Sequence, residues 1–271
     1  MLKFQWVLPT RKSLCPQNDD SPAEFYHENS KLSPALAQAL SADFQFSSFE
    51  LHVVSRAFKQ FGDVPRIVLP DTTSSEETLQ SVMRRRRSSR NIAGRFSLAD
   101  LSTLLRQSLG PTAVFHNADC DVNQAFRAWP SAGGLYPLDT YVIASSIEGL
   151  SPALYHYNPI ASELERLPSR SPEAILREGF FWQDFITTAA AVILLVAVFK
   201  RTIAKYGERG YRLVLLDAGH ASQNLLLTAE QLRLGATPLA GFCDDSLAAD
   251  LGIDGISEAV VLAVAAGKPN G

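Results

Sequence analysis

Cysteine is scarce in this chain of 271 residues, and its distribution excludes the sites that cysteine most often builds. The three cysteines, Cys15, Cys120 and Cys243, are far apart and form no Cys-x-x-Cys pair or Cys/His spacing typical of zinc. An odd number of scattered cysteines is typical of a reducing compartment. We therefore expect a cytoplasmic protein without a metal centre.

Long hydrophobic runs are also lacking. The apolar run within residues 1–12 is too short for a signal peptide. The most apolar segment, residues 187–199, has 13 residues, whereas a membrane helix needs about 20. This segment is typical of a buried strand with a short lead-in, and the sequence predicts no membrane association.

An excess of positive charge is absent as well, because the formal net charge is −3 and the isoelectric point is about 6.0. This balance argues against a chain-wide nucleic-acid surface and predicts no nucleic-acid partner. Residues 83–98, MRRRRSSRNIAGRFSL, nevertheless hold six arginines, so their role is local. A solvated basic face, an import signal and a grip on one small phosphate are the alternatives for such a run.

Two regions of the chain differ in composition. In residues 1–80, proline, serine and polar residues interrupt short apolar pieces, and residues 70–78 resemble a linker. We interpret residues 1–80 as an extension packed onto, or swapped across, a core domain of residues 81–271. Peptide or partner docking is a hypothesis for the role of the extension.

Hydrophobic patterns beyond Ser97 predict an α+β layered structure with one long helix. Residues 98–109 carry a helical apolar stripe, with Ser97 as N-cap and Gly110 as the stop. The other predicted elements are a hairpin of strands at 139–147 and 153–159, a central strand at 190–199, a helix at 208–235 ended by Gly235, a short helix at 244–252 and a last buried strand at 258–267.

Within the arginine run, Arg86, Ser88 and Arg90 stand at alternate positions. They share one face if the segment is extended, so two guanidinium forks and a hydroxyl would converge on one dianion. This spacing favours the phosphate grip, although a solvated face is the usual role of a basic run.

Two glycine-containing loops could lie against a flat aromatic ligand. Residues 129–143, WPSAGGLYPLDTYVI, combine a proline turn with small residues before a strand. Small residues leave backbone N–H groups accessible to ring oxygens and nitrogens. Residues 238–245, PLAGFCDD, place Gly241 between a strand-like segment and a helix start. For either loop alone, a tight turn without a ligand is the common case.

The pair Lys205–Tyr206 lies within KYGERGYR, which introduces the long helix. A lysine partly desolvated among arginines can act as a base, and an adjacent tyrosine can relay or donate a proton. Charged residues that only pack a helix entry are the usual alternative.

Taken in order, these segments resemble one family. The run from RRSSR through FSLADLSTLL, WPSAGGLYPLDTYVI, KYGERGYR and DAGHASQNLLL to LGATPLAGF is similar to the flavin-dependent, nitroreductase-like azoline dehydrogenases. These are the oxidising subunits of microcin-type and streptolysin-type thiazole/oxazole synthetases. The resemblance covers roughly residues 84–268 and extends weakly to residues 25–32.

The resemblance implies an α+β nitroreductase-like fold with a mixed central sheet, a long central helix and FMN at a homodimer interface. It assigns the catalytic role to Lys205 and Tyr206. Nitroreductases often carry a further arginine after the last strand, and we expect Lys268 to substitute for it in this chain. The residues that it implies for FMN are Arg86, Ser88 and Arg90 on the phosphate with Arg87 nearby, Pro130, Ser131, Ala132, Gly133 and Gly134 on the ring, and Ala240 and Gly241 near the flavin N5.

The implied activity is oxidation of thiazoline or oxazoline rings in a peptide or carrier-bound substrate, with dioxygen reoxidising the flavin. A cyclodehydratase is the implied partner. Two alternatives stay open: a reductase of nitro compounds or quinones fed by NAD(P)H, and a scaffold without catalysis in a peptide-modifying complex. The Lys–Tyr pair favours the dehydrogenase, because hydride relay through FMN needs no protein base.

Overall fold

The computed structural model describes residues 22–34, 59–72, 75–117, 122–180 and 183–269. The chain divides into two compact units, Met1–Asp43 and Phe44–Gly271. The described part of the first unit contains helix α1 (Pro22–Asn29). All other elements named below belong to the second unit. Cys15, Cys120 and the segment tested for a signal peptide lie outside the described residues.

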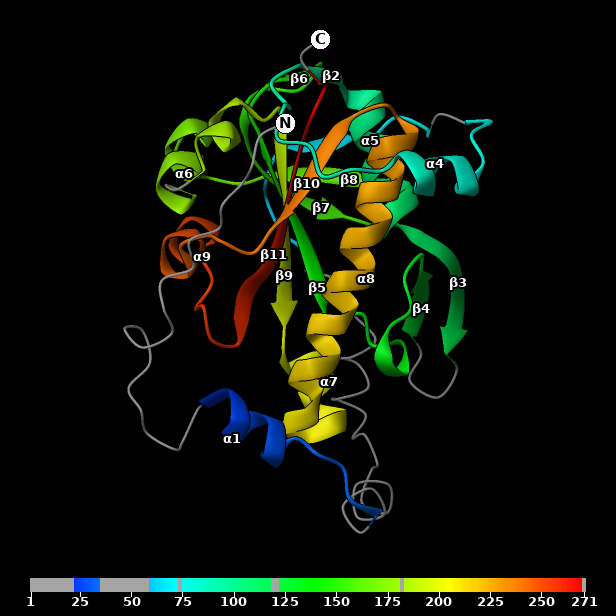
Figure 1. Cartoon of the computed structure of the whole chain (residues 1–271), viewed down its shortest axis with the longest axis vertical. Helices are drawn as coiled ribbons and strands as arrows, with labels where there is room; N and C mark the ends of the chain where they lie inside the picture. The colour runs from blue at the N-terminus through cyan, green and yellow to red at the C-terminus, as the bar shows by residue number, and fades with distance from the viewer. Residues whose placement is uncertain (1–21, 35–58, 73–74, 118–121, 181–182, 270–271) are drawn as a thin grey trace, which may run out of the picture. The chain divides into compact units, whose positions relative to one another are not determined.

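A seven-stranded sheet forms the centre of the second unit, with the strands in the order β1-β8-β7-β5-β9-β11-β10 (Figure 1). The strands are β1 (Arg66–Val68), β5 (Leu138–Ala144), β7 (Ala153–Asn158), β8 (Glu163–Arg166), β9 (Ala191–Val198), β10 (Gly235–Leu239) and β11 (Glu258–Gly267). The predicted hairpin, central strand and last strand are therefore confirmed as β5–β7, β9 and β11.

Every pairing in this sheet is antiparallel, so the prediction of a mixed sheet is wrong in that detail. Parallel neighbours require a long crossover, and the chain has one between β9 and β10. That crossover runs through α7 (Lys200–Tyr206) and α8 (Gly210–Gln231). However, β11 inserts between β9 and β10 and pairs antiparallel with both. The predicted α+β fold class is confirmed.

Helices cover both faces of the sheet. Helices α5 (Leu98–Leu109) and α8 pack on one face, whereas α6 (Pro172–Gly179) and α9 (Asp244–Leu251) pack on the other (Figure 1). Alternate residues of β9 accordingly face different cores: Ile193 and Leu195 contact the α8 side, while Val192 and Leu194 contact the α9 side. Burial on both faces explains why this strand is continuously apolar.

Helix ends follow the local sequence signals, with one exception. Helix α5 begins at a capping box between Ser97 and Asp100 and ends at Gly110, as predicted. Helix α8 ends at Gln231, four residues before the predicted stop at Gly235. Arg233 adopts the left-handed φ of 58° that turns the chain.

Gly235 serves packing instead of helix termination, since it starts β10. A Cβ atom at this glycine would lie 2.9 Å from Cγ2 of Ile92 and 3.1 Å from Oγ of Ser89. The end of the arginine run therefore lies directly against the start of β10.

The remaining elements surround this framework, and β1 comes from the predicted extension but pairs with β8 in the main sheet. They are α4 (Leu79–Arg85), β2 (Phe96–Ser97), β3 (Pro111–Asn117), β4 (Val122–Arg127), β6 (Ile147–Glu148) and the 3₁₀ turns η2 (Ala132–Gly134), η3 (Asp184–Thr188) and η4 (Gly207–Arg209). Among the described residues, no helix has both the length and the apolar character to cross a bilayer.

Candidate functional site

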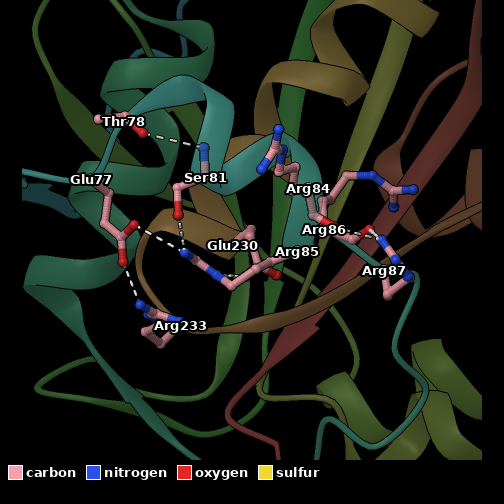
Figure 2. Close-up of polar contacts among 9 residues, drawn as sticks. All are labelled: Glu77, Thr78, Ser81, Arg84, Arg85, Arg86, Arg87, Glu230 and Arg233. Carbon is pink, nitrogen blue, oxygen red and sulfur yellow. Dashed lines mark hydrogen bonds and ion pairs between the residues drawn. The ribbon is translucent and has the colours of Figure 1, made fainter.

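The arginine run divides into structural and exposed members. Helix α4 ends within it, and Arg85 points inward to an ion-pair cluster (Figure 2). Its guanidinium lies 3.1 Å from the Glu77 carboxylate and 3.0 Å from that of Glu230 on α8. Arg233 also pairs with Glu77. These contacts fasten α4 to the C-terminal end of α8.

The electrostatics of this cluster agree with its geometry. The hydrogen bond from Arg85 lowers the pKa of Glu77 below its usual range, and the charge of Arg233 adds to the effect. The same contact raises the pKa of Arg85. Arg85 is thus committed to the fold, whereas Figure 2 shows Arg84 and Arg86 pointing away from the cluster.

Three predicted phosphate residues follow directly. Arg86 leaves the helix in an extended conformation, with φ −48° and ψ 123°. Arg87 turns back on its own chain and donates to the carbonyl oxygens of Arg84 and Arg86, at 3.1 and 2.8 Å (Figure 2). Ser88 is exposed and forms a bridge with Ala236 of β10.

Arg90 is exposed, and its guanidinium carbon lies 5.9 Å from the ring centre of Phe185 in η3. Within the described part of the chain, no carboxylate forms an ion pair with Arg86 or Arg90. Their positive charges therefore stay uncompensated at the surface, which suits an anionic ligand. Arg87, in contrast, already donates to two backbone carbonyl oxygens.

Three further predicted residues lie beside this segment. Lys268 exchanges backbone hydrogen bonds with Gly94, four residues beyond Arg90. The carbonyl of Gly241 accepts a bond of 2.7 Å from Gln183, which precedes η3. Ala240 is exposed next to it. The structure therefore brings the end of the arginine run, Lys268 and the Ala240–Gly241 loop to one region.

The loop of residues 130–134 forms a second group. Gly133 and Gly134 have φ angles of 64° and 66°, which only glycine adopts without strain. Pro130, Gly133 and Gly134 are exposed, and Trp129 and Tyr136 on either side are buried. The loop thus presents exposed backbone at Gly133 and Gly134, next to the buried aromatic residues Trp129 and Tyr136.

The Lys–Tyr pair lies directly against this loop. A Cβ atom placed on Gly133 would lie 2.8 Å from Oη of Tyr206 and 3.1 Å from Nζ of Lys205. The pair ends α7, and Nζ of Lys205 lies 5.6 Å from the ring centre of Tyr206. Tertiary structure therefore joins two motifs that are about 70 positions apart in the sequence.

Asp217 of α8 connects the same elements, and sequence analysis missed it. Its carboxylate accepts hydrogen bonds from the hydroxyl of Ser131, at 2.5 Å, and from the backbone N–H of Ala132. Burial raises the pKa of Asp217, and these bonds oppose the rise. Burial also raises the pKa of Tyr206, and the Asp217 charge adds to that rise.

A sequence signal for Asp217 did exist. Val214, Ala218, Ala221 and Leu225 form the buried stripe of α8, and Asp217 lies within the same stripe. A carboxylate among apolar core positions needs a specific partner. Apolar periodicity alone does not reveal that partner, because Ser131 is distant in sequence.

The two groups occupy opposite halves of α8. Glu230 pairs with Arg85 near the C-terminal end of α8, and Asp217 accepts from Ser131 nearer the other end. These two acidic residues are 13 positions apart, which is about 20 Å along a helix axis. We call the group around Arg86, Ser88 and Arg90 and the group around the loop at 130–134 the two half-sites. Among the described residues, no cluster of three or more His, Cys, Asp or Glu forms a metal site.

Comparison with known proteins identifies the fold family. The model of the nitroreductase family matches residues 83–268, which include both half-sites. The chain belongs to the nitroreductase family. A protein named as a nitroreductase from Methanocaldococcus jannaschii, MJ1384, is 32% identical over 187 residues, covering 69% of this chain and 89% of that protein.

A second curated relative is the microcin B17-processing protein McbC of Escherichia coli. It is 27% identical over 140 residues, which are 49% of this chain and 51% of McbC. This nitroreductase-family chain thus matches about half of McbC.

Solved structures show the same fold. A nitroreductase from Anabaena variabilis has a TM-score of 0.65 at 30% identity, covering 76% of this chain and 42% of that one. The E. coli microcin synthetase McbBCD complex with truncated pro-MccB17 bound has a TM-score of 0.56 at 19% identity and 92% coverage of both chains. A nitroreductase from Exiguobacterium sibiricum in complex with FMN has a TM-score of 0.51 at 16% identity, covering 74% and 92%.

Proposed function

We propose that this nitroreductase-family protein is an FMN-dependent dehydrogenase that oxidises thiazoline or oxazoline rings to thiazoles or oxazoles. The observation that carries the proposal is the contact between Lys205, Tyr206 and the exposed Gly133. A reductase site needs a surface for the flavin ring, but it does not need a base beside that surface. The similarity to the microcin B17-processing protein supports the same chemistry.

The residues present fit FMN. Arg86 and Arg90 offer uncompensated charges for its phosphate, with Ser88 and Lys268 beside them. The glycine loop at 133–134 offers accessible backbone for its ring. When bound there, FMN would supply a hydride acceptor for the azoline ring, and dioxygen would serve as the terminal oxidant.

The protein residues then have separate tasks. Lys205 takes the proton from the neighbouring ring carbon, so that loss of a proton and a hydride converts the azoline into the azole. Tyr206 orients the ring or relays the proton. The loop at 130–134 holds the reacting faces together and limits the access of water.

We propose that FMN is shared by a homodimer, because the two half-sites contact α8 at different positions. The phosphate and ring of FMN are joined by a chain of about seven bonds, which spans roughly 9 Å at backbone-like bond lengths. Glu230 and Asp217, the α8 residues that contact the two groups, lie about twice that length apart along the helix. Leu215 and Leu216 expose apolar surface on α8, which supports pairing of two copies there. One FMN would then contact residues of both chains.

The experiment combines Lys205→Ala with a pre-cyclised azoline peptide. We expect the variant to retain FMN and the dimer, while azole formation falls by a factor on the order of 10²–10⁴. Tyr206→Phe should lose less, because it keeps the aromatic ring. Mass spectrometry counts the two hydrogens lost from each ring. Wild-type rates in Lys205→Ala, or loss of flavin from it, would contradict the assignment.

A reductase of nitro compounds or quinones is the second candidate. The identity with MJ1384 and the Anabaena protein, both named as nitroreductases, favours it. Rapid bleaching of the wild-type flavin by NADPH, without azole formation, would establish this alternative. A scaffold without catalysis predicts that removal of FMN leaves the output of a peptide-modifying complex unchanged. A cyclodehydratase partner rests on the family resemblance.

A further inference from the structure

Asp217 is a buried acidic residue of α8 that the proposed mechanism has not yet used. Its side chain is 4% exposed, and among the described residues no lysine or arginine forms an ion pair with it. A buried carboxylate without such a partner is costly unless hydrogen bonds compensate it. Both compensating donors come from the loop, one from the Ser131 hydroxyl and one from the Ala132 backbone.

Ser131 links its hydrogen bond with Asp217 to the far end of the loop. While it donates to Asp217, its oxygen accepts a bond of 2.9 Å from the backbone N–H of Tyr136. The two ends of the glycine turn are therefore held through one hydroxyl. Gly133 lies inside this turn, against Lys205 and Tyr206.

We propose that Asp217 is a positioning residue that holds the glycine loop 131–134 in register with Lys205 and Tyr206. Its effect on turnover rests on the proposed function, whereas its effect on the loop and on Tyr206 does not. The carboxylate has two acceptor oxygens for two donors. An asparagine has one acceptor oxygen and an NH₂ group, so it cannot accept from the Ser131 hydroxyl and the Ala132 N–H on two separate oxygens as the carboxylate can.

The test compares Asp217→Asn with wild-type protein saturated with FMN. Tyrosine labelled at Cζ with ¹³C reports the titration of Tyr206, which is assigned with Tyr206→Phe. Because Asp217 contributes to the raised pKa of Tyr206, we expect Tyr206 to titrate at lower pH in the variant. Lys205 is another charged neighbour of this tyrosine, and it is unchanged between the two proteins.

Amide hydrogen exchange gives the second readout. Protection at residues 132–136 should fall in Asp217→Asn, and Ser131→Ala should show part of the same loss. Ser222→Ala is the matched control, because Ser222 is also buried on α8 at 3% exposure and belongs to neither half-site. The control should leave both readouts unchanged. If Asp217→Asn fails to fold, Ser131→Ala still decides the result.

Turnover then tests the catalytic consequence. We expect kcat in Asp217→Asn to fall on the order of 10- to 100-fold with little change in KM, since a small displacement of reacting groups has effects of this size. Wild-type Tyr206 titration and loop protection in Asp217→Asn would overturn the proposal. Changed readouts in a protein whose wild-type form oxidises no azoline would reject only the proposed function.

Discussion

Arginines a few positions apart in the sequence have different roles, because their side chains contact different partners. Arg85 faces Glu77 and Glu230, so its charge is compensated, and its Nε and Nη1 groups donate to these carboxylates. Arg90 lies over Phe185 at the surface, where its charge is available to a ligand. A guanidinium whose charge is already paired with carboxylates attracts a phosphate less strongly than an unpaired one. Side-chain partners therefore separate a structural arginine from a binding arginine.

At the scale of one residue, we expect Arg90→Glu to weaken FMN retention. The substitution replaces a donor to the phosphate with a negative charge that repels it. The ratio of flavin absorbance to protein absorbance after gel filtration measures the loss.

Arg177→Glu on α6 is the control, since Arg177 is exposed and pairs with its helix neighbour Glu173. Arg85→Ala should show the opposite pattern, with slightly lower stability and unchanged flavin. Equal flavin content in Arg90→Glu and wild type would remove Arg90 from the phosphate site.

At the scale of elements, strands β7 and β8 are joined by a buried polar pair. His156 and Glu165 are register partners, and Nδ1 of His156 lies 2.7 Å from the Glu165 carboxylate. Tyr141 and Phe61 pack on the imidazole, each with a centroid distance of 5.1 Å. Burial lowers the pKa of His156, although its bond to Glu165 works in the other direction. The strand pair therefore contains a histidine that is harder to protonate in the folded protein than in the unfolded chain.

This histidine predicts the pH dependence of stability. The unfolded chain binds a proton at His156 below about pH 6.5. The folded protein binds this proton only at a lower pH, because the pKa of His156 is lowered. The free energy of unfolding should therefore decrease as the pH falls from about 6.5 toward the lowered pKa, by at most about 1.4 kcal/mol per pH unit. Urea denaturation at fixed FMN concentration measures this slope.

His156→Gln is the appropriate comparison, because glutamine still donates to Glu165 and does not titrate near neutral pH. The variant should be less stable at pH 7 and should show a flatter pH dependence between 6.5 and 5. An unchanged slope would mean that other groups cause the acid sensitivity.

For the whole molecule, the position of the half-sites on α8 makes assembly part of the proposed function. Arg85, directly before the proposed phosphate residues, contacts Glu230 of α8, and Ser131 of the glycine loop contacts Asp217 of the same helix. The separation of about 20 Å between those acidic residues follows from helix geometry. A second copy is the occupant that would bring complementary half-sites together.

We accordingly expect Leu216→Asp to dissociate the dimer and to release FMN at the same time. Leu216 is 58% exposed on α8, and a carboxylate would oppose burial of that surface in an interface. Light scattering after gel filtration gives the mass, and flavin absorbance of the same peak gives the occupancy.

Ile256→Asp is the matched control, since Ile256 is 83% exposed and precedes β11. It should change neither mass nor flavin content. A monomeric wild-type protein that retains FMN, or a Leu216→Asp monomer that does, would contradict the shared site.

Much of the fold could be predicted because its signals are local. The capping box at Ser97, the apolar run of β9 and the last strand depend on residues near each other in the chain, and the structure confirms them. The predicted helix end at Gly235 is wrong, because α8 ends at Gln231. Gly235 instead allows the close approach of Ile92, a residue far away in the sequence. The boundary at residue 80 stays a prediction, although β1 joins the main sheet.

The site shows the same division. The sequence by itself determined which residue types are present: an arginine run, a glycine loop, and a lysine beside a tyrosine. It also determined the left-handed turn, because glycine alone accepts that backbone conformation without strain. Only the tertiary structure decided that Gly133 lies against Lys205, that Asp217 binds the loop through Ser131, and that Arg85 forms an ion pair with Glu230. Backbone preferences act over a few residues, whereas the partner of a side chain depends on packing between distant segments.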